Sequence, residues 1–333
     1  MNFLLFIITA LIIALVGSYL TKVADRLADQ SGIGEALMGG IFLGASTSLS
    51  GTITSVASAA HGHTSLSISN ALGGIALQTF FLCIADINYK KSNLEHASVS
   101  TANIMMGLLL ILLLTIPILA QNFSQETYLS IHPVTLGLFA VYILGFKYIK
   151  KQQQQEDMWL PKETNKTVKD RPKESRIYGK LPRLWFMFAF LSALLAISGY
   201  FIEKIGISIA SDWNISHLVL GTIFTALATS LPELIVTIVA IKRNAVTLAI
   251  GGIIGGNTYD ILFLGLSDIA YRDGSLYHEM QPDHFSLIAL NIAMTSLLLM
   301  GLIRREKNGL SNIGTETWAM IIIFIGGMTS ILW

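Results

Sequence analysis

Ten apolar segments, each about as long as a membrane-spanning helix, occupy most of this 333-residue chain. A helix needs about 20 predominantly apolar residues to cross the hydrocarbon core of a bilayer. The chain is 53% hydrophobic and only 13% charged, whereas a soluble domain carries roughly 25% charged residues. We therefore expect an all-α integral membrane protein with ten transmembrane helices, at about residues 2–21, 33–60, 66–88, 98–120, 127–148, 182–207, 214–241, 246–270, 283–303 and 313–333. The first segment has no basic residues before its apolar run, so we interpret it as a helix and not as a signal peptide.

The lysines and arginines lie almost entirely in alternate loops between these segments. Twenty of the 22 fall on one side, and only Lys204 and Arg272 fall on the other. The excess of positive charge marks the cytoplasmic side, so we expect both termini to lie outside. The longest polar stretch, residues 149–181, is rich in Lys, Gln and Pro. It is predicted to be a mobile cytoplasmic loop that joins a first half, residues 1–148, to a second half, residues 182–333.

The two halves contain an internal repeat. A shift of 182 places residues 39–89 on 221–271 without a gap, and 16 of the 51 positions are identical. Because each half has five predicted helices, an odd number, the two copies would cross the membrane in opposite senses. Transporters with inverted repeats of this kind bind their substrate near the membrane midplane, where the repeats meet.

Two acidic residues, Glu233 and Asp260, fall well inside predicted spans. A carboxylate at the centre of a membrane helix costs about 2.5–3.5 kcal/mol on insertion scales, so it must face protein, water or an ion. Glu35, Asp86 and Asp268 lie nearer to the ends of their spans, and we expect water to solvate them there.

Oxygen-bearing side chains accompany the two buried acids. Thr229 and Glu233 share a helix face, as do Asn257 and Asp260, and Pro232 leaves a backbone carbonyl without its helical donor. Carboxylate, hydroxyl and carbonyl oxygens are the ligands of hard cations such as Ca²⁺ or Na⁺. The residues that we predict to hold a cation are Glu233, Asp260, Asn257, Thr229 and Ser230 from the second repeat, and Thr47, Ser48, Ser50, Asn70 and Gln78 from the first.

These motifs resemble the cation/calcium exchanger superfamily, typified by sodium/calcium exchangers. That family has ten helices in two inverted halves, with two repeats that read roughly G-T-S-x-P-E and then G-N/D-x-x-G-S-N. The stretches "ATSLPEL" and "GGIIGGNTYDIL" of the second repeat match well, and "STSLSGT" and "SNALGGIALQ" of the first match more loosely. The resemblance implies that Thr229, Ser230, Glu233, Asn257, Thr47, Ser48 and Asn70 fall on ion-binding positions.

The first repeat departs from the family pattern where charge matters most. Gly51 stands in place of the glutamate and Ser50 in place of the proline, so the two opposed glutamates of the family are reduced to Glu233. Asp260 stands where Asn is common. Loss of one acid weakens the attraction for a dehydrated divalent ion. The site can therefore remain divalent with the help of Asp260, become selective for monovalent ions or protons, or lose transport.

The primary hypothesis is a secondary active antiporter that exchanges Ca²⁺ or a related cation for Na⁺ or H⁺. The alternative is a transport-inactive or monovalent-cation relative that binds ions. An intramembrane aspartyl protease is excluded, because Asp260 and Asp268 are about 12 Å apart along one helix and such acids must nearly touch. We expect no enzymatic activity, no cofactor and no nucleic-acid partner. The expected partners are inorganic cations and the lipid bilayer, in the plasma membrane of a bacterial cell.

Three remaining polar or reactive side chains have simpler interpretations. Cys83 is expected to be a buried apolar residue, since one cysteine allows no intramolecular disulfide. His61 and His63 are expected to lie in a solvated turn, because two ligands do not close a metal site.

Overall fold

Helices cover every apolar segment that the sequence predicts, in a computed structural model that describes residues 2–89, 91–98, 100–124, 131–153, 166–167, 181–211, 220–307, 309 and 313–332. In chain order they are α1 (Asn2–Ser31), α2 (Glu35–Leu37), the π-helical turn η1 (Met38–Leu43), α3 (Gly44–Thr47), α4 (Leu49–Ala60), α5 (Thr64–Asn88), α6 (Leu94–Ala97), α7 (Thr101–Ala120), α8 (Pro133–Gln153), α9 (Leu181–Ser211), the π-helical turn η2 (Leu220–Thr225), α11 (Ala226–Lys242), α12 (Val246–Asp260), α13 (Leu262–Ala270), the 3₁₀ turn η3 (Leu276–Glu279), α14 (Pro282–Arg304) and α15 (Thr315–Leu332). Among the described residues, seven helices are long and apolar enough to span a membrane, or eight if the bent pair α2–α3 and α4 counts as one span. The total of ten spans stays a prediction.

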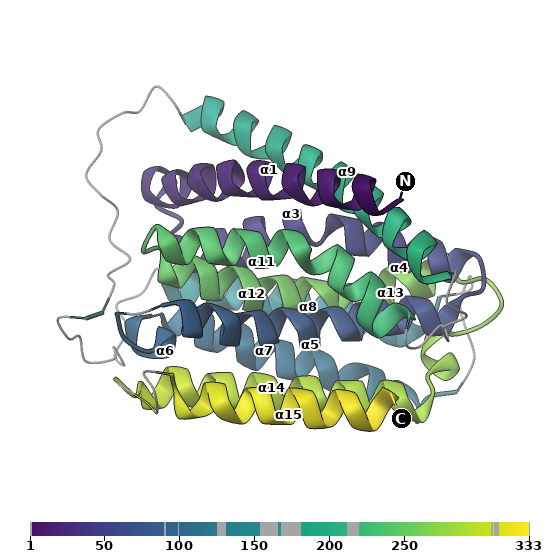
Figure 1. Ribbon diagram of the computed structural model, residues 1–333. Helices are drawn as coiled ribbons and strands as arrows, with labels where there is room; N and C mark the ends of the chain where they lie inside the picture. The colour runs from purple at the N-terminus through teal and green to yellow at the C-terminus, as the bar shows by residue number, and fades with distance from the viewer. Residues whose placement is uncertain are drawn as a thin grey trace.

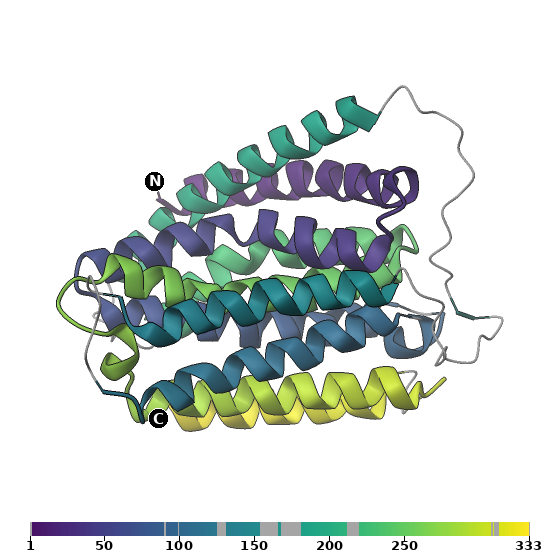
Figure 2. The ribbon, with the colours of Figure 1, turned by 180° about the vertical axis from the view of Figure 1, so that it is seen from behind.

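The helices form an elongated bundle with α1 and α9 along one side and α14 and α15 along the other (Figures 1 and 2). Helices α5 and α12 lie between them, and their side chains are almost all buried. The outer helices instead expose large apolar side chains, such as Leu15, Phe186 and Ile322. An apolar outer surface around a buried polar interior is the arrangement that a bilayer requires, and the protein is an integral membrane protein.

The shift of 182 that aligns the sequence also relates local backbone structure. The π-helical turns η1 and η2 begin at Met38 and Leu220 and end at Leu43 and Thr225. The turns that follow α4 and α11 contain Gly62 and Asn244, both with φ in the left-handed region, at 77° and 65°. Asn is among the few residues besides Gly that adopt this conformation readily. The first helix of each copy therefore contains a π-helical turn and is followed by a turn residue in the left-handed conformation.

Helices of one copy of the repeat pack closely against helical turns of the other copy. A Cβ atom added at Gly73 in α5 would lie 2.8 Å from the Cα atom of Thr222 in η2. The equivalent Gly255 in α12 packs so tightly against Gly40 in η1 that a Cβ atom there would overlap its backbone. Small residues allow membrane helices to approach this closely. The second helix of each copy thus packs against the π-helical turn of the other copy.

Asp86 and Asp268 make a matching set of hydrogen bonds near opposite ends of the bundle. Each carboxylate is buried and accepts from a backbone N–H eight residues later, at 2.6 Å for Leu94 and 3.0 Å for Leu276. Each also binds the first turn of a helix in the other half: Asp86 accepts from Gly314 N (3.1 Å) and Thr317 Oγ1 (2.9 Å), and Asp268 accepts from His132 N (2.9 Å) and Thr135 Oγ1 (2.7 Å).

The expectation that water solvates these acids was wrong. Asp86 and Asp268 are about 1% and 0% exposed, and Glu35 is only 8% exposed. Glu35 accepts from the backbone N–H of Leu248 at the start of α12. All three carboxylates satisfy the free N–H groups at helix starts, which are favourable partners for negative charge. They hold the bundle together instead of facing solvent.

Several smaller predictions agree with the structure. Cys83 is buried, and His61 and His63 lie in an exposed turn. Most of the predicted loop at 149–181 lies outside the described residues.

Candidate cation site

Helices α4, α5, α11, α12 and α13, together with the break before α4, surround a small cavity in the interior of the bundle. The loop-like break between α3 and α4, with a bend of 48°, places Ser48 and Gly51 on one side. Helix α11 places Thr229, Ser230 and Glu233 opposite them. The remaining polar wall comes from α5 and α12, and the full lining is Ser48, Gly51, Asn70, Gly74, Gln78, Thr229, Ser230, Glu233, Asp260 and Phe263.

The two carboxylates are buried and each accepts a hydrogen bond from the first repeat. Ser48 Oγ donates to Glu233 Oε1 at 3.2 Å, and Glu233 is 3% exposed. Gln78 Nε2 donates to Asp260 Oδ2 at 2.6 Å, and Asp260 is 2% exposed. Gln78 and Asp260 are 182 residues apart, so the two equivalent positions of the repeats contact each other directly.

Several buried oxygen atoms of the lining residues lack partners. Glu233 Oε2, Asp260 Oδ1 and Gln78 Oε1 have no hydrogen-bond partner among the described residues. Leaving a buried acceptor unpaired is costly, and more so for a charged group. Oxygen acceptors that gather without donors fit a hard cation such as Ca²⁺ or Na⁺. No group of three His, Cys, Asp or Glu side chains with metal-binding geometry occurs in the described part of the chain, so the other ligands of such a cation would be neutral oxygens.

Neutral side chains complete the polar wall. Asn70 Nδ2 donates to the carbonyl of Gly51 at 3.3 Å and to Ser55 Oγ at 2.9 Å. Its Oδ1 atom accepts from Thr229 Oγ1 at 3.5 Å. These bonds fix the amide of Asn70 so that its oxygen faces α11.

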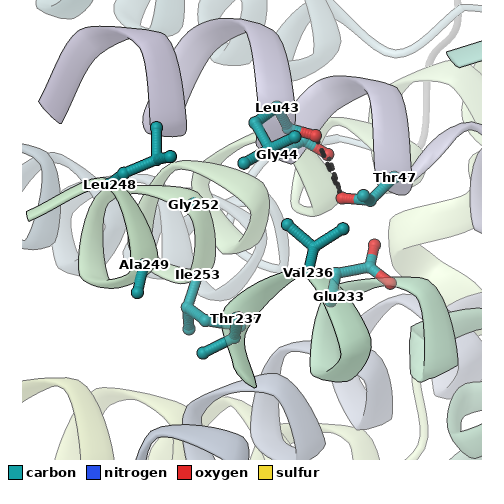
Figure 3. A pocket seen from close by; sticks show the side chains of 10 residues that line it. All are labelled: Leu43, Gly44, Thr47, Glu233, Val236, Thr237, Leu248, Ala249, Gly252 and Ile253. Carbon is teal, nitrogen blue, oxygen red and sulfur yellow. Dashed lines mark hydrogen bonds between the residues drawn. The ribbon is translucent and has the colours of Figure 1, made fainter. Parts of the chain in front are cut away.

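The structure brings together seven of the ten residues predicted from the sequence, since Ser48, Asn70, Gln78, Thr229, Ser230, Glu233 and Asp260 line the cavity. Thr47 lies beside Glu233 in a second, mostly apolar cavity (Figure 3), so Glu233 borders both. Ser50 and Asn257 line neither cavity. Ser50 Oγ faces Gly199 of α9, and Asn257 Nδ2 donates to Thr79 Oγ1 at 2.8 Å.

Sequence reasoning missed one lining residue with a bulky side chain, Phe263. A phenylalanine in an apolar segment carries no signal of its own. Its position three residues after Asp260 was the available clue, because residues three apart lie on the same helix face. Gly51, which the sequence marked as the place of a missing acid, lies directly beside the Phe263 ring.

A buried, oxygen-lined cavity with two carboxylates, inside an all-helical membrane bundle, is the interior expected of an ion-transporting membrane protein. The family model described as sodium/calcium exchanger protein matches residues 1–148 and 183–332. The chain belongs to this family, as the sequence motifs predicted. Its members are transporters and not enzymes.

Two curated relatives and one group of solved structures illustrate the similarity. The sodium/calcium exchanger MaX1 of Methanosarcina acetivorans is 31% identical over 137 residues, 40% of this chain and 39% of that protein. The inner membrane protein YrbG of Escherichia coli is 24% identical over 263 residues, 79% of this chain and 78% of that protein. The sodium–calcium exchanger NCX_Mj, soaked with Na⁺ and Sr²⁺, matches with a TM-score of 0.70 at 17% identity, over 99% of this chain and 98% of that chain. This last likeness shows a common fold.

Proposed function

We propose that this chain is a secondary active cation antiporter in which Glu233 holds the transported cation and Asp260 supplies the second charge. The exchange is of Ca²⁺ or a related cation for Na⁺ or H⁺, by alternating access between two inverted five-helix repeats. The observation that carries this proposal is the pair of buried carboxylates whose unpaired oxygens line one cavity. Relatives named as a sodium/calcium exchanger and a sodium–calcium exchanger support the same class of cargo.

The arrangement of charges explains why such a site would exchange ions and would not leak them. Two buried carboxylates that share a cavity repel each other, and each is poorly solvated without a counter-ion. A cation between them offsets both costs. The empty site is therefore unfavourable, and passage of the unloaded protein between its two states is disfavoured. Each turnover then carries either the exported cation or the coupling ion.

The distribution of basic residues supports an orientation. We place the protein in a plasma membrane, the inner membrane of a bacterial cell, with both termini outside and residues 149–181 in the cytoplasm. Helix α1 begins and α15 ends at the same end of the bundle (Figure 1), in keeping with this orientation. The relative YrbG is named an inner membrane protein.

One observation favours a second candidate, an ion-binding relative that is transport-inactive or carries monovalent cations. Gly51 provides no acid opposite Glu233, and Phe263 fills the space beside it. If Asp260 does not bind the ion, Glu233 is the single charge where the family pattern has two, and one carboxylate attracts a divalent ion less strongly than two. Equilibrium binding without flux would support a transport-inactive protein, and flux of Na⁺ or K⁺ alone would support a monovalent one.

Flux in proteoliposomes tests the antiporter. The purified protein is reconstituted, and uptake of Ca²⁺, Mn²⁺ or Mg²⁺ is measured against outward gradients of Na⁺, K⁺ or H⁺. Glu233→Gln and Asp260→Asn should each lower gradient-driven uptake by at least about a hundredfold, because each removes a charge from a poorly solvated site. Asp273→Asn, which neutralises an exposed acid, is the matched control and should behave as wild type. Wild-type uptake and binding in Glu233→Gln would rule out the assignment.

A further inference from the structure

The cavity has one bulky apolar wall, formed by the ring of Phe263. Phe263 is 3% exposed and packs edge to face on Tyr259, with ring centroids 5.9 Å apart and planes at 85°. All other lining residues are polar, charged or glycine. The ring therefore supplies no oxygen ligand on the side of the cavity that Gly51 forms.

Gly51 and Phe263 compete for the same space. A Cβ atom added at Gly51 would lie 2.9 Å from Cε2 and 3.4 Å from Cζ of the Phe263 ring, and 3.7 Å from Cβ of Thr229. A contact of 2.9 Å is shorter than carbon atoms tolerate. Any side chain at position 51 thus requires the ring to move.

Gly51 lies at a position from which a side chain would reach the cavity. Residue 51 is equivalent to Glu233 under the shift of 182, so a side chain there would enter the cavity from the face opposite Glu233. The backbone of Gly51 already contributes, because its carbonyl accepts from Asn70 Nδ2 at 3.3 Å. A ring at this place keeps out both a third carboxylate and the water that would solvate it.

We propose that Phe263 determines the cation specificity of the site, because together with Gly51 it excludes a third carboxylate and so limits the affinity for divalent cations. Ca²⁺ takes six to eight oxygen ligands, and the ring removes one side from which they could come. The inference rests on the proposed cation site, and it adds that residues 51 and 263 act as a pair. A carboxylate at position 51 should bind a divalent ion only when the ring is made smaller.

Binding of Ca²⁺ to four purified proteins tests this coupling: wild type, Gly51→Glu, Phe263→Ala and the double variant. Equilibrium dialysis should show that the double variant binds Ca²⁺ at least about tenfold more tightly than wild type. This gain is a modest part of the attraction that one added charge provides at contact. Each single variant should stay within about threefold of wild type, because Gly51→Glu leaves the ring in place and Phe263→Ala adds no charge. The cycle of four proteins then isolates the coupling between the two sites. If Gly51→Glu alone gains as much as the double variant, or the double variant gains nothing, the inference is overturned.

A second cycle keeps the test decisive if Gly51→Glu does not fold. Gly51→Ala should lower the melting temperature, and Phe263→Leu added to it should restore most of the loss, because the smaller side chain makes room for the methyl group. If the double variant loses as much melting temperature as the two single variants Gly51→Ala and Phe263→Leu lose together, the steric pair is contradicted.

Glu233→Gln separates this inference from the proposed function. If it binds Ca²⁺ as wild type does, the proposed cation site fails and the inference fails with it. If it abolishes binding while the double variant shows no gain, only the role of Phe263 fails.

Discussion

Helix α5 in the first half and the pair α12–α13 in the second are equivalent under the shift of 182, yet they differ in charge. Their glycines, Gly73 and Gly255, and their terminal acids, Asp86 and Asp268, contact the backbone of the other half in the same way. The residues between them differ, because α5 has Gln78 where α12 has Asp260. These glycines and terminal acids are the same in the two copies, whereas the cavity pairs Gln78/Asp260 and Gly51/Glu233 differ in charge.

The hydrogen-bond networks around Asp86 and Asp268, at the two ends of the bundle, also differ in charge. Thr317 Oγ1 donates to Asp86 and also to Glu95 Oε1, at 3.2 Å. At the equivalent place, Thr135 Oγ1 donates to Asp268, and its oxygen lies 3.0 Å from the hydroxyl of Tyr277. One network therefore contains two carboxylates that share one hydroxyl proton, and the other pairs its carboxylate with a neutral phenol.

Exchanging Gln78 and Asp260 tests the divergence at the cavity and should have the largest effect. Asp260→Gln alone should lower cation uptake in proteoliposomes by at least about a hundredfold, because a unit charge at contact in a partly dry site is worth several kcal/mol. Adding Gln78→Asp should restore most of it, since the two side chains are 2.6 Å apart and the charge moves only that far.

The single variant Gln78→Asp is the control for the exchange, and it should add a third charge without removing one. If the exchanged protein is as inactive as Asp260→Gln, the position of the carboxylate matters and not only its presence. The two repeats would then have distinct roles at the cavity.

Neutralising the terminal acids tests the similarity between the halves and should give the next largest effect. Asp268→Asn should destabilise the protein by about 2–4 kcal/mol, because the amide cannot accept all the N–H and O–H bonds that the buried carboxylate accepts. Asp86→Asn should cost less when melting is measured above about pH 8, where Glu95 is charged, since it also relieves the repulsion between Asp86 and Glu95. Thermal melting of both variants in detergent measures the difference, and a larger loss for Asp86→Asn would contradict it.

The helices and the acidic residues of the cavity could be predicted from the sequence, because apolar length and a charge in an apolar segment are both local signals. The partners of Asp86 and Asp268 could not. Each carboxylate binds a helix start more than 130 residues away in the chain, and a residue near the end of a span looks the same whether it meets water or another helix. The π-helical turns and the Phe263 wall likewise depend on packing between the two halves, which no local pattern records.

The pH dependence of stability tests the difference between the ends and should give the smallest effect. Burial, the charge of Asp86 and the charge of Glu316 raise the pKa of Glu95 from 4.5 to about 8. The folded protein then holds a proton that the unfolded chain releases, so the stabilisation is complete below about pH 4.5 and is lost as the pH rises through about 8. Burial also raises the pKa of Tyr277 above its usual value of 10, so the phenol of the opposite network stays neutral over this range.

Melting temperatures between pH 5 and pH 9 should therefore fall by roughly 3–6 °C more in wild type than in Glu95→Gln, which keeps a neutral acceptor for Thr317. Tyr277→Phe is the matched variant at the other end and should keep the wild-type slope. The variant retains the other charged or titratable side chains at this end, which are Asp86, His96, Arg304, Arg305, Glu306 and Glu316. Equal slopes in wild type and Glu95→Gln would show that Glu95 is charged throughout, and the two ends would then differ in composition but not in their response to pH.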